Sequence, residues 1–398
     1  MTKLELDYLK SEVGQKAYKQ HCLDSDTKLE LLVLKNQVTN PFFGALASLI
    51  KLRRAAQNKF SKSDEMFFTS LSLEQATSER IAKYIAKRFK PEWIAQDLTC
   101  SLGGNTIFLA EKVKQVIAVD LSEEKIDCAK ENAKAYGVEN KIEFIIGDAF
   151  LNINQKADAF FLDPARDREG DTKTRSFLNS SPSLLDILPQ LFAITHNVAV
   201  KISPAFDYEE LKDLPEEPEI EIISENNNCK VAMLWFGEFK TANRRATGFK
   251  KDEFFSFIGE ADSVADFSEV KKYLYEPNKA ISKAHLIDEV ANKFVLSKID
   301  YNLSFLTSDE LVNEDDSNIF RKFEVLHFDK FSLKQFQSFL KNQKIERAEI
   351  IVKHFKMTAD EIRKRLKIKE GGESVIILTT LQNQEKVFIL AKKIHNLE

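Results

Sequence analysis

Carboxylates stand at the ends of several short apolar runs, where they could bind polar ligands. The run "AFFL" at 159–162 stops abruptly at Asp163 and Pro164. Proline has no N–H for a sheet ladder and biases the residue before it toward extended geometry, so Asp163 is expected at the carboxyl end of a strand. Open α/β sheets bind their ligands at that edge. A carboxylate there can accept hydrogen bonds from an amine.

A second candidate site is the stretch "DLTCSLGGNT" at 97–106, which follows an apolar run and opens a helical pattern. Small residues such as Gly103 let a backbone turn approach a ligand closely, and the helix N-terminus behind them favours a negatively charged group. Ser101 fits such a tight turn only if its φ stays negative. An ordinary strand-to-helix turn is the alternative interpretation.

Two more acids follow the next apolar runs. Asp120 ends "VIAVD", about twenty residues after the turn, where an acid can accept hydrogen bonds from both hydroxyls of a ribose. Its alternative role is to cap the following helix. Asp148, in "IEFIIGDAF", could reach the amino edge of an adenine ring. A nicotinamide site needs G-x-G-x-x-G, which "SLGGNT" does not supply. A cofactor with a ribose and an adenine but no phosphates fits better, and S-adenosyl-L-methionine is such a molecule.

These residues need an α/β sheet to bring them together. The strands predicted between about 93 and 240 are Trp93–Leu98, Val116–Val119, Ile142–Ile146, Ala159–Leu162, Val198–Ile202 and Val231–Phe236. Helical stretches separate the early ones, for example Ser122–Tyr136 with Ser122 as N-cap, which favours a parallel sheet with helices on both faces. Lys201 and Ser203 end a later strand, so they are expected at the same edge, contacting substrate or only ending the strand.

Helical patterns precede this region, and a small α+β pattern follows it. Apolar residues in 71–90 recur on one helical face, and Pro91 is expected to end that helix. The stretch 273–294 indicates an entry loop followed by a helix. Beyond it, Phe323–Phe328, Lys334–Lys341, Ala348–Phe355, Ala359–Leu366, Val375–Leu381 and Val387–Ala391 predict the order β-α-β-α-β-β.

Composition excludes some classes of protein. With 43% hydrophobic and 30% charged residues, the 398-residue chain is typical of a globular protein of several domains. No apolar run approaches the roughly 20 residues of a membrane span, no secretory signal is visible, and the four scattered cysteines predict neither disulfides nor a metal site. We therefore expect a cytoplasmic protein without membrane or metal partners.

Charge is distributed unevenly along the chain. The segment from Lys330 to Glu398 carries 12 lysines and 3 arginines against 8 acidic residues, a net charge of +7, whereas the rest carries −11. A basic terminal module on an acidic body fits a part that meets polyanions, although a solvated lysine-rich face has the same composition.

The motif series D-x-T-C-x-x-G-G-x-T, V-D, G-D-A and D-P-A-R resembles the class I S-adenosylmethionine-dependent methyltransferases. With "LEQATS" (73–78), "VKISPAFD" (200–207), "YEPNKAI" (275–281) and the basic tail, the chain more narrowly resembles little-characterised bacterial members that end in a THUMP-like domain. The resemblance implies a helical domain at 1–90, a Rossmann-like core at 91–258, a linking ferredoxin-like or helical segment at 259–322 and a THUMP-like α+β domain at 323–398.

The resemblance also implies roles for individual residues. The cofactor-binding set would be Gln75, Thr77, Asp97, Ser101, Gly103, Asn105, Asp120 and Asp148. Asp163, Pro164 and Arg166 match the D/N-P-P-Y-type loop of methyltransferases that act on exocyclic amines. Arg166 would hold a phosphate or stack on a base, or would instead pair with a neighbouring acid.

The implied substrate is an exocyclic base nitrogen of structured RNA, tRNA or rRNA. The tail would bind RNA phosphates through Lys353, Lys356, Arg363 and Arg365. Two alternatives stay open: a methyltransferase acting on a small molecule or protein, and an RNA-binding protein whose core has lost activity. Methylation of a pyrimidine C5 is disfavoured, because no cysteine follows Asp163 closely.

Overall fold

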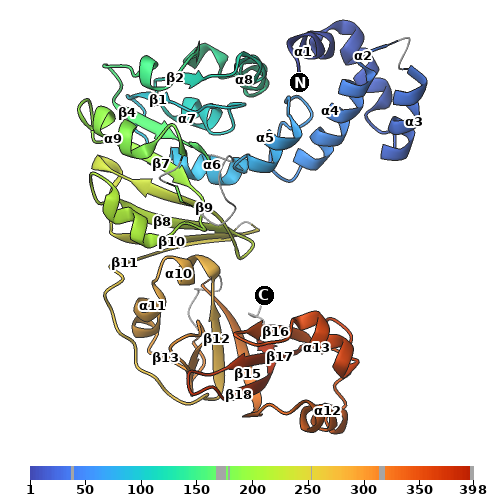
Figure 1. Ribbon diagram of the computed structural model, residues 1–398, viewed down its shortest axis with the longest axis vertical. Helices are drawn as coiled ribbons and strands as arrows, with labels where there is room; N and C mark the ends of the chain where they lie inside the picture. The colour runs from blue at the N-terminus through green and yellow to red at the C-terminus, as the bar shows by residue number, and fades with distance from the viewer. Residues whose placement is uncertain (37–39, 167–175, 178–179, 252, 313–318, 395–398) are drawn as a thin grey trace. The chain divides into compact units, whose positions relative to one another are not determined.

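The computed structural model describes residues 1–36, 40–166, 176–177, 180–251, 253–312 and 319–394 (Figure 1). Their contacts divide the chain into two compact units. Unit 1 comprises Met1–Glu219 and Val231–Thr241, and unit 2 comprises Ile220–Lys230 and Ala242–Glu398. No helix in the described part is long and apolar enough to cross a membrane.

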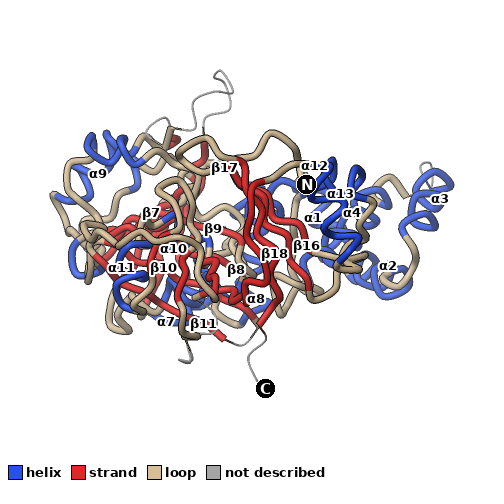
Figure 2. Tube along the Cα trace, turned by 90° about the horizontal axis from the view of Figure 1, so that it is seen from below, coloured by secondary structure: helices blue, strands red, loops and turns tan. Residues whose placement is uncertain are grey.

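Unit 1 begins with helices, as the composition of residues 1–90 indicates. They are α1 (Lys3–Lys10), α2 (Glu12–His21), α3 (Asp26–Asn36), α4 (Phe43–Ala56), α5 (Ser70–Gln75) and α6 (Glu79–Ala86). Figure 2 shows α2 and α3 as a group separate from the strands of the sheet. The single helix predicted over 71–90 is wrong: Ala76 is extended, so the chain breaks between α5 and α6, and α6 ends at Ala86, before Pro91.

The sheet of unit 1 has the predicted strands. β1 (Ile94–Asp97), β2 (Gln115–Asp120), β3 (Ile142–Ile146), β4 (Ala159–Leu162) and β7 (Val198–Ile202) are parallel in the order β3-β2-β1-β4-β7. β9 (Asn228–Trp235) runs antiparallel to β7. All four residues of β4 are buried, as expected for a central strand covered on both faces. Two short strands, β5 (Ala165–Arg166) and β6 (Ser180–Ser181), form a separate pair.

Helices between these strands complete an α/β core. α7 (Thr106–Lys112) and α8 (Glu123–Tyr136) pack against β2 and against each other, and α9 (Leu184–Phe192) precedes β7. Ser122 caps α8 as predicted, because its Oγ accepts a hydrogen bond from the Lys125 N–H. The helix ends at Gly137, whose φ of +69° is readily adopted only by a residue without a side chain.

Unit 2 contains strands that the sequence did not reveal. β8 (Glu219–Glu225) runs parallel to β10 (Arg244–Lys250), which forms a hairpin with β11 (Glu253–Gly259). The entry loop expected before residue 279 is also wrong. Its "YLYEP" residues form β12 (Tyr273–Pro277), with short helices α10 (Lys279–Lys283) and α11 (Ile287–Lys293) following. Tyr275 is fully buried there, and aromatic residues of this kind are enriched in β-strands.

The rest of unit 2 is a seven-stranded sheet in the order β13-β14-β12-β15-β18-β17-β16. The predicted β-α-β-α-β-β tail is confirmed. Its elements are β15 (Phe320–Lys330), α12 (Leu333–Asn342), β16 (Glu349–Lys353), α13 (Ala359–Leu366), β17 (Ser374–Thr380) and β18 (Lys386–Ile394), and the two shorter strands are β13 (Ser297–Lys298) and β14 (Leu306–Ser308).

Alternating side chains of the β17–β18 hairpin supply two cores. On one face Ile376 and Leu378 pack with Phe336 of α12 and Ile362 of α13. On the other face Ile377 packs with residues that include Leu274, Phe305 and Phe323. The predicted fold class is confirmed: an α/β core with a helical N-terminal region and a C-terminal α+β part. The boundaries of the four predicted domains stay a prediction.

Candidate functional site

The carboxyl ends of the parallel strands in unit 1 form one edge, on which most predicted site residues lie. Backbone bonds join neighbouring strand ends there: the Cys100 N–H donates to the Val119 carbonyl and the Gly147 N–H to the Asp120 carbonyl. A side chain links β1 to β4, because the Asp163 N–H donates to Thr99 Oγ1 at 2.6 Å. The turn after β1, Asp120, Asp148, Asp163 and Lys201 are therefore neighbours on one edge, as parallel topology requires.

The turn after β1 is fixed from inside by Asp97, which is only 1% exposed. Its Oδ1 accepts the Thr99 N–H at 3.1 Å, and its Oδ2 accepts the hydroxyl of Thr106 at 2.6 Å. Burial, reinforced by the nearby charges of Asp163 and Asp120, raises the pKa of Asp97 to about 7. Asp97 was predicted to contact the cofactor, and the structure places it where it supports the turn.

Ser101 does not meet the condition of a negative φ that the sequence analysis set for a serine in this turn. Its φ is +51°, in the left-handed region, and that of Gly103 is +82°. The Ser101 N–H donates to Asp120 Oδ2 at 2.9 Å, which helps to stabilise this conformation. Beyond them, a Cβ built on Gly104 would meet nothing within 4 Å, so this part of the turn has open space beside its backbone.

Asp120 is 8% exposed at the end of β2. Its carboxylate accepts hydrogen bonds from the turn after β1 and from the turn after β2. Oδ2 accepts from Ser101 and Oδ1 from the Ser122 N–H at 3.0 Å, with Lys125 Nζ at 3.7 Å from Oδ1. Each carboxylate oxygen has a second lone pair, which could accept a ribose hydroxyl. The half-buried Asp148 accepts the Phe150 N–H on Oδ1, closing the turn after β3.

Asp163 forms an ion pair that the sequence did not predict. Lys201, at the end of β7, places Nζ 2.5 Å from Asp163 Oδ2, and its side chain is 11% exposed against 33% for Asp163. Lys201 had been expected to contact substrate or only to end its strand. Ser203 Oγ accepts the Ala205 N–H at 3.2 Å and shapes the loop after β7. Pro164 follows Asp163 directly, and the side chain of Arg166 lies outside the described part of the structure.

The segment before the core contains orphaned polar atoms. Gln75 is exposed at the end of α5, whereas Thr77 and Ser78 are buried. Thr77 Oγ1, Ser78 Oγ and Asn105 Oδ1 are all buried without a hydrogen-bond partner among the described residues. Buried polar atoms normally have partners. These three atoms, two of them in residues predicted to bind the cofactor, therefore have unmade hydrogen bonds in the described part of the structure.

Asn132 of α8 is a site residue that sequence reasoning missed. It is fully buried, its Oδ1 accepts the Phe67 N–H at 2.7 Å, and its amide donates to the carbonyls of Phe67 (3.1 Å) and Leu102 (3.0 Å). Asn132 thus joins the segment that leads to Thr77 with the turn that contains Ser101. The sequence did offer one sign of this role, because Asn132 is a polar residue on the apolar face of the helix predicted over Ser122–Tyr136.

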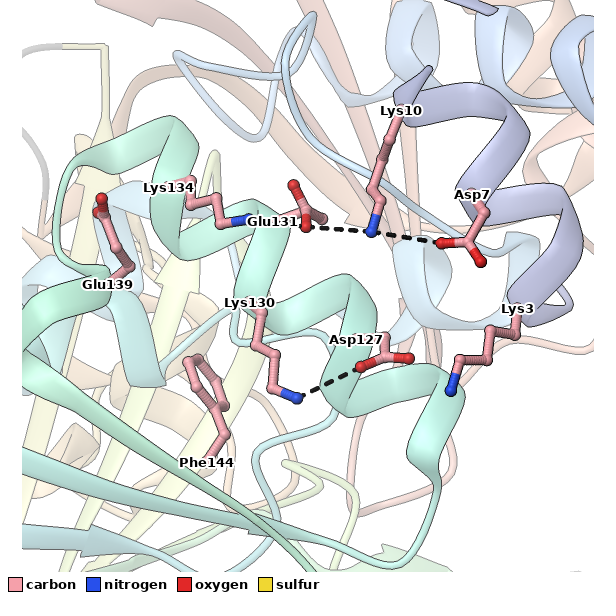
Figure 3. A pocket seen from close by; sticks show the side chains of 9 residues that line it. All are labelled: Lys3, Asp7, Lys10, Asp127, Lys130, Glu131, Lys134, Glu139 and Phe144. Atoms are coloured by element: carbon pink, nitrogen blue, oxygen red, sulfur yellow. Dashed lines mark hydrogen bonds and ion pairs between the residues drawn. The ribbon is translucent and has the colours of Figure 1, made fainter.

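A hollow of about 460 Å³ lies on the other side of α8, against α1 (Figure 3). Its lining alternates in charge, and the cations pair with neighbouring acids: Lys10 contacts Asp7 at 3.5 Å and Glu131 at 3.4 Å, and Lys130 contacts Asp127 at 3.3 Å. We interpret this hollow as the ion-paired contact of α1 with the core. No group of three or more potential metal ligands occurs in the described residues.

The four basic residues predicted to bind RNA lie in unit 2: Lys353 ends β16, Lys356 lies in the connection that follows, and Arg363 and Arg365 belong to α13. Lys356 and Arg365 are exposed. The half-buried Arg363 donates to the Ala348 carbonyl at 3.3 Å, so it also ties α13 to β16. Lys353 Nζ lies 3.9 Å from Glu276 Oε1. Two of the four are thus available on the surface, and two have partners within the unit.

Sequence profiles of three families match parts of the chain. The family described as RNA cap guanine-N2 methyltransferase matches residues 93–165, a ferredoxin-like domain matches 273–314, and a THUMP domain-like family matches 320–393.

Curated relatives and a solved structure are similar to different lengths of the chain. An uncharacterised S-adenosylmethionine-dependent methyltransferase of Mycobacterium tuberculosis H37Rv is 26% identical over 341 residues, covering 83% of this chain and 90% of the relative. Trimethylguanosine synthase of Saccharomyces cerevisiae is 37% identical over 101 residues, covering 24% of this chain and 32% of the relative. A Porphyromonas gingivalis W83 protein, named as a methyltransferase in its crystal structure, has the same fold, with a TM-score of 0.80 at 22% identity over 96% of this chain and 97% of that one. Over most of its length the chain is therefore similar to S-adenosylmethionine-dependent methyltransferases, and its C-terminal part is similar to a THUMP-like domain.

Proposed function

We propose that this protein methylates an exocyclic nitrogen of a base in structured RNA, using the strand-end edge of unit 1 as its active site. The observation that carries the proposal is the Asp163–Pro164 pair at the end of β4, where a partly exposed carboxylate is fixed by Lys201. S-adenosylmethionine supplies an already activated methyl group. The protein's own task is then to hold and desolvate the amine, which can lower the barrier by about 7–11 kcal/mol.

Each residue of the edge has a role in this proposal. Asp120 accepts the ribose hydroxyls, Asp148 faces the adenine amino group, and the turn from Ser101 to Asn105 with Thr77 and Gln75 surrounds the methionine end. Asp163 and the Pro164 carbonyl accept the N–H bonds of the substrate amine and direct its lone pair. A paired base must first be unstacked, at a cost of a few kcal/mol.

Two observations favour RNA over a small molecule. The core matches the RNA cap guanine-N2 methyltransferase profile, and an uncharacterised RNA methyltransferase of Clostridium tetani is 28% identical over 134 residues, covering 32% of this chain and 29% of the relative. The tail from Lys330 to Glu398 carries a net charge of +7, as expected for a surface that binds phosphates. A cytoplasmic location, where such RNA is found, is part of the proposal.

Transfer of a radioactive methyl group to total RNA from a strain that lacks the protein tests this function. Label should appear in RNA, and digestion should yield a nucleoside methylated on an exocyclic nitrogen. Asp163→Asn should lower the rate at least 100-fold while leaving cofactor affinity within about threefold. Label in the protein or small-molecule fraction only, or cofactor binding without any transfer, would contradict the proposal.

A further inference from the structure

Unit 2 contains a cavity of about 280 Å³ that the methyl-transfer site does not use. It lies between the turn after β8, the end of β10, the β12–α10 junction and the start of β15. Ligand sites in proteins are typically a few hundred Å³ or larger, so this cavity suits one small ligand. Every residue that lines it belongs to unit 2.

Two asparagines give the cavity unused hydrogen-bond donors. Asn227 Oδ1 accepts the Lys279 N–H at 2.9 Å, and Asn278 Oδ1 accepts the Ala280 N–H at 2.9 Å and the Ser224 hydroxyl at 2.8 Å. These bonds fix both amides with their NH₂ groups as the remaining polar atoms. Neither NH₂ group has an acceptor within the described ranges of the chain.

Charged groups add further donors. Arg321 Nη1 donates to Glu276 Oε2 at 3.1 Å and Nη2 to Glu349 Oε1 at 2.6 Å, which uses two of its five N–H groups. Lys250 is exposed at the rim, and Lys353 Nζ approaches Glu276 Oε1 at 3.9 Å. The carboxylate of Glu276 is therefore already compensated, and the lining favours a ligand rich in acceptors or negative charge.

Part of the lining is apolar and aromatic. Phe249 and Phe320 are 8% and 5% exposed, and both line the cavity with Ile319. An apolar wall beside convergent donors suits a planar ring with carbonyl oxygens or ring nitrogens on its edge. A phosphate attached to such a ring would complement Lys250 and Arg321.

We propose that this cavity binds a single nucleotide, with its base against Phe249 and Phe320 and its acceptors on Asn227, Asn278 and Arg321. This lining could bind either an unpaired nucleotide of an RNA chain or a free nucleotide. We assign the RNA chain, a choice that rests on the proposed function.

Isosteric variants of the full-length protein test the site. Asn227→Asp and Asn278→Asp keep the oxygens that accept backbone N–H groups, and Asp tolerates the left-handed conformation of residue 227 (φ +59°). Each variant replaces an NH₂ donor by a negative charge inside the cavity. Asn228→Asp is the matched control: it adds the same charge one residue away, at a side chain that does not line the cavity.

The measurement is equilibrium binding, without cofactor, of a fluorescein-labelled single-stranded RNA 12-mer of mixed sequence and, separately, of the four nucleoside 5′-monophosphates. We expect Asn227→Asp and Asn278→Asp to weaken RNA binding at least tenfold, with unchanged melting temperatures, and Asn228→Asp to change it less than twofold. If the two variants weaken binding of a nucleoside monophosphate but not of RNA, the cavity is a nucleotide site whose ligand is a free nucleotide instead of RNA. Binding that is absent in the wild type, or equal in all variants, would overturn the inference. Methyl transfer is not measured, so a protein that binds RNA in this cavity but does not methylate it would still give the expected result.

Discussion

At the scale of single residues, the centre of the site is an ion pair rather than an isolated carboxylate. Lys201 Nζ contacts Asp163 Oδ2 at 2.5 Å, and Thr99 Oγ1 holds the backbone N–H of the same aspartate. Two neighbouring strands therefore fix the group that is proposed to receive the amine. A rigidly held acceptor retains its orientation when substrate enters.

Lys201→Met should lower the rate of methyl transfer while leaving cofactor binding nearly unchanged. The variant keeps the length and apolar stem of lysine but frees the Asp163 carboxylate, so we expect kcat for RNA methylation to fall about 10- to 100-fold. Cofactor affinity should stay within about twofold, because none of the residues proposed to bind the cofactor belongs to β7. Equal losses in kcat and in cofactor affinity, measured by steady-state kinetics and calorimetry, would assign Lys201 to the fold instead.

Asp97→Asn should remove a pH dependence of stability. The pKa of buried Asp97 is about 7 against an ordinary 3.8, so the folded state holds this proton more tightly than the unfolded state. Its contribution favours folding at pH 4 and is lost as the pH rises to 7, by up to about 4 kcal/mol. Asparagine stays neutral, so the unfolding free energy of the variant relative to wild type should rise between pH 4 and 7. A constant difference in urea titrations across this range would contradict the burial argument.

The sequence predicted which acids end strands, because an apolar run followed by an acid or proline is a local signal. It could not predict their partners. The ion pair between Asp163 and Lys201 spans 38 positions, and the left-handed φ of Ser101 depends on Asp120 accepting its N–H. Both are consequences of tertiary packing.

At the scale of elements, α8 connects the two parts of the proposed cofactor site. Its outer face pairs with α1, whereas its inner face presents Asn132 to Phe67 and Leu102. One helix therefore fixes both the turn after β1 and the chain that leads to α5.

Asn132→Ala should weaken the attachment to α8 of both the turn after β1 and the chain that leads to α5. The substitution leaves the Phe67 N–H and two carbonyls without partners, which we expect to cost about 3 kcal/mol of stability. Cofactor affinity should fall at least tenfold. Lys134→Ala, on the exposed face of the same helix, is the control for thermal melting and calorimetry. An Asn132 variant that melts early but binds cofactor normally would show that the link has only a structural role.

Elements with strong local patterns were predicted, including all five parallel strands and the β-α-β-α-β-β tail. The strands β8, β10, β11 and β12 were missed. β10 has one aromatic residue, Phe249, which follows Gly248. Gly248 is required because a Cβ there would meet the Phe255 ring of β11 at 2.2 Å. The sequence of either strand alone does not reveal cross-strand packing of this kind.

At the scale of the whole molecule, the basic segment beyond Lys330 gives an acidic chain an attraction for polyanions. A double variant, Lys356→Ala with Arg365→Ala, should weaken binding of structured RNA and reduce the salt dependence of log K by about 1 for each cation removed. Filter binding between 50 and 200 mM salt would measure this slope. The control is Lys114→Ala, which removes an exposed lysine of unit 1 and should leave the salt dependence of log K unchanged. Equal slopes for the wild type and all variants would show that RNA binds elsewhere on the protein.

The most direct test of the account is calorimetric titration of the protein with S-adenosylmethionine, compared with Asp120→Ala and with Asp127→Ala as a control on the outer side of α8. The account predicts micromolar binding by the wild type and by Asp127→Ala, and at least a tenfold loss for Asp120→Ala. Binding that is undetectable in the wild type, or unaffected by Asp120→Ala, would contradict the assignment of the strand-end edge as the cofactor site.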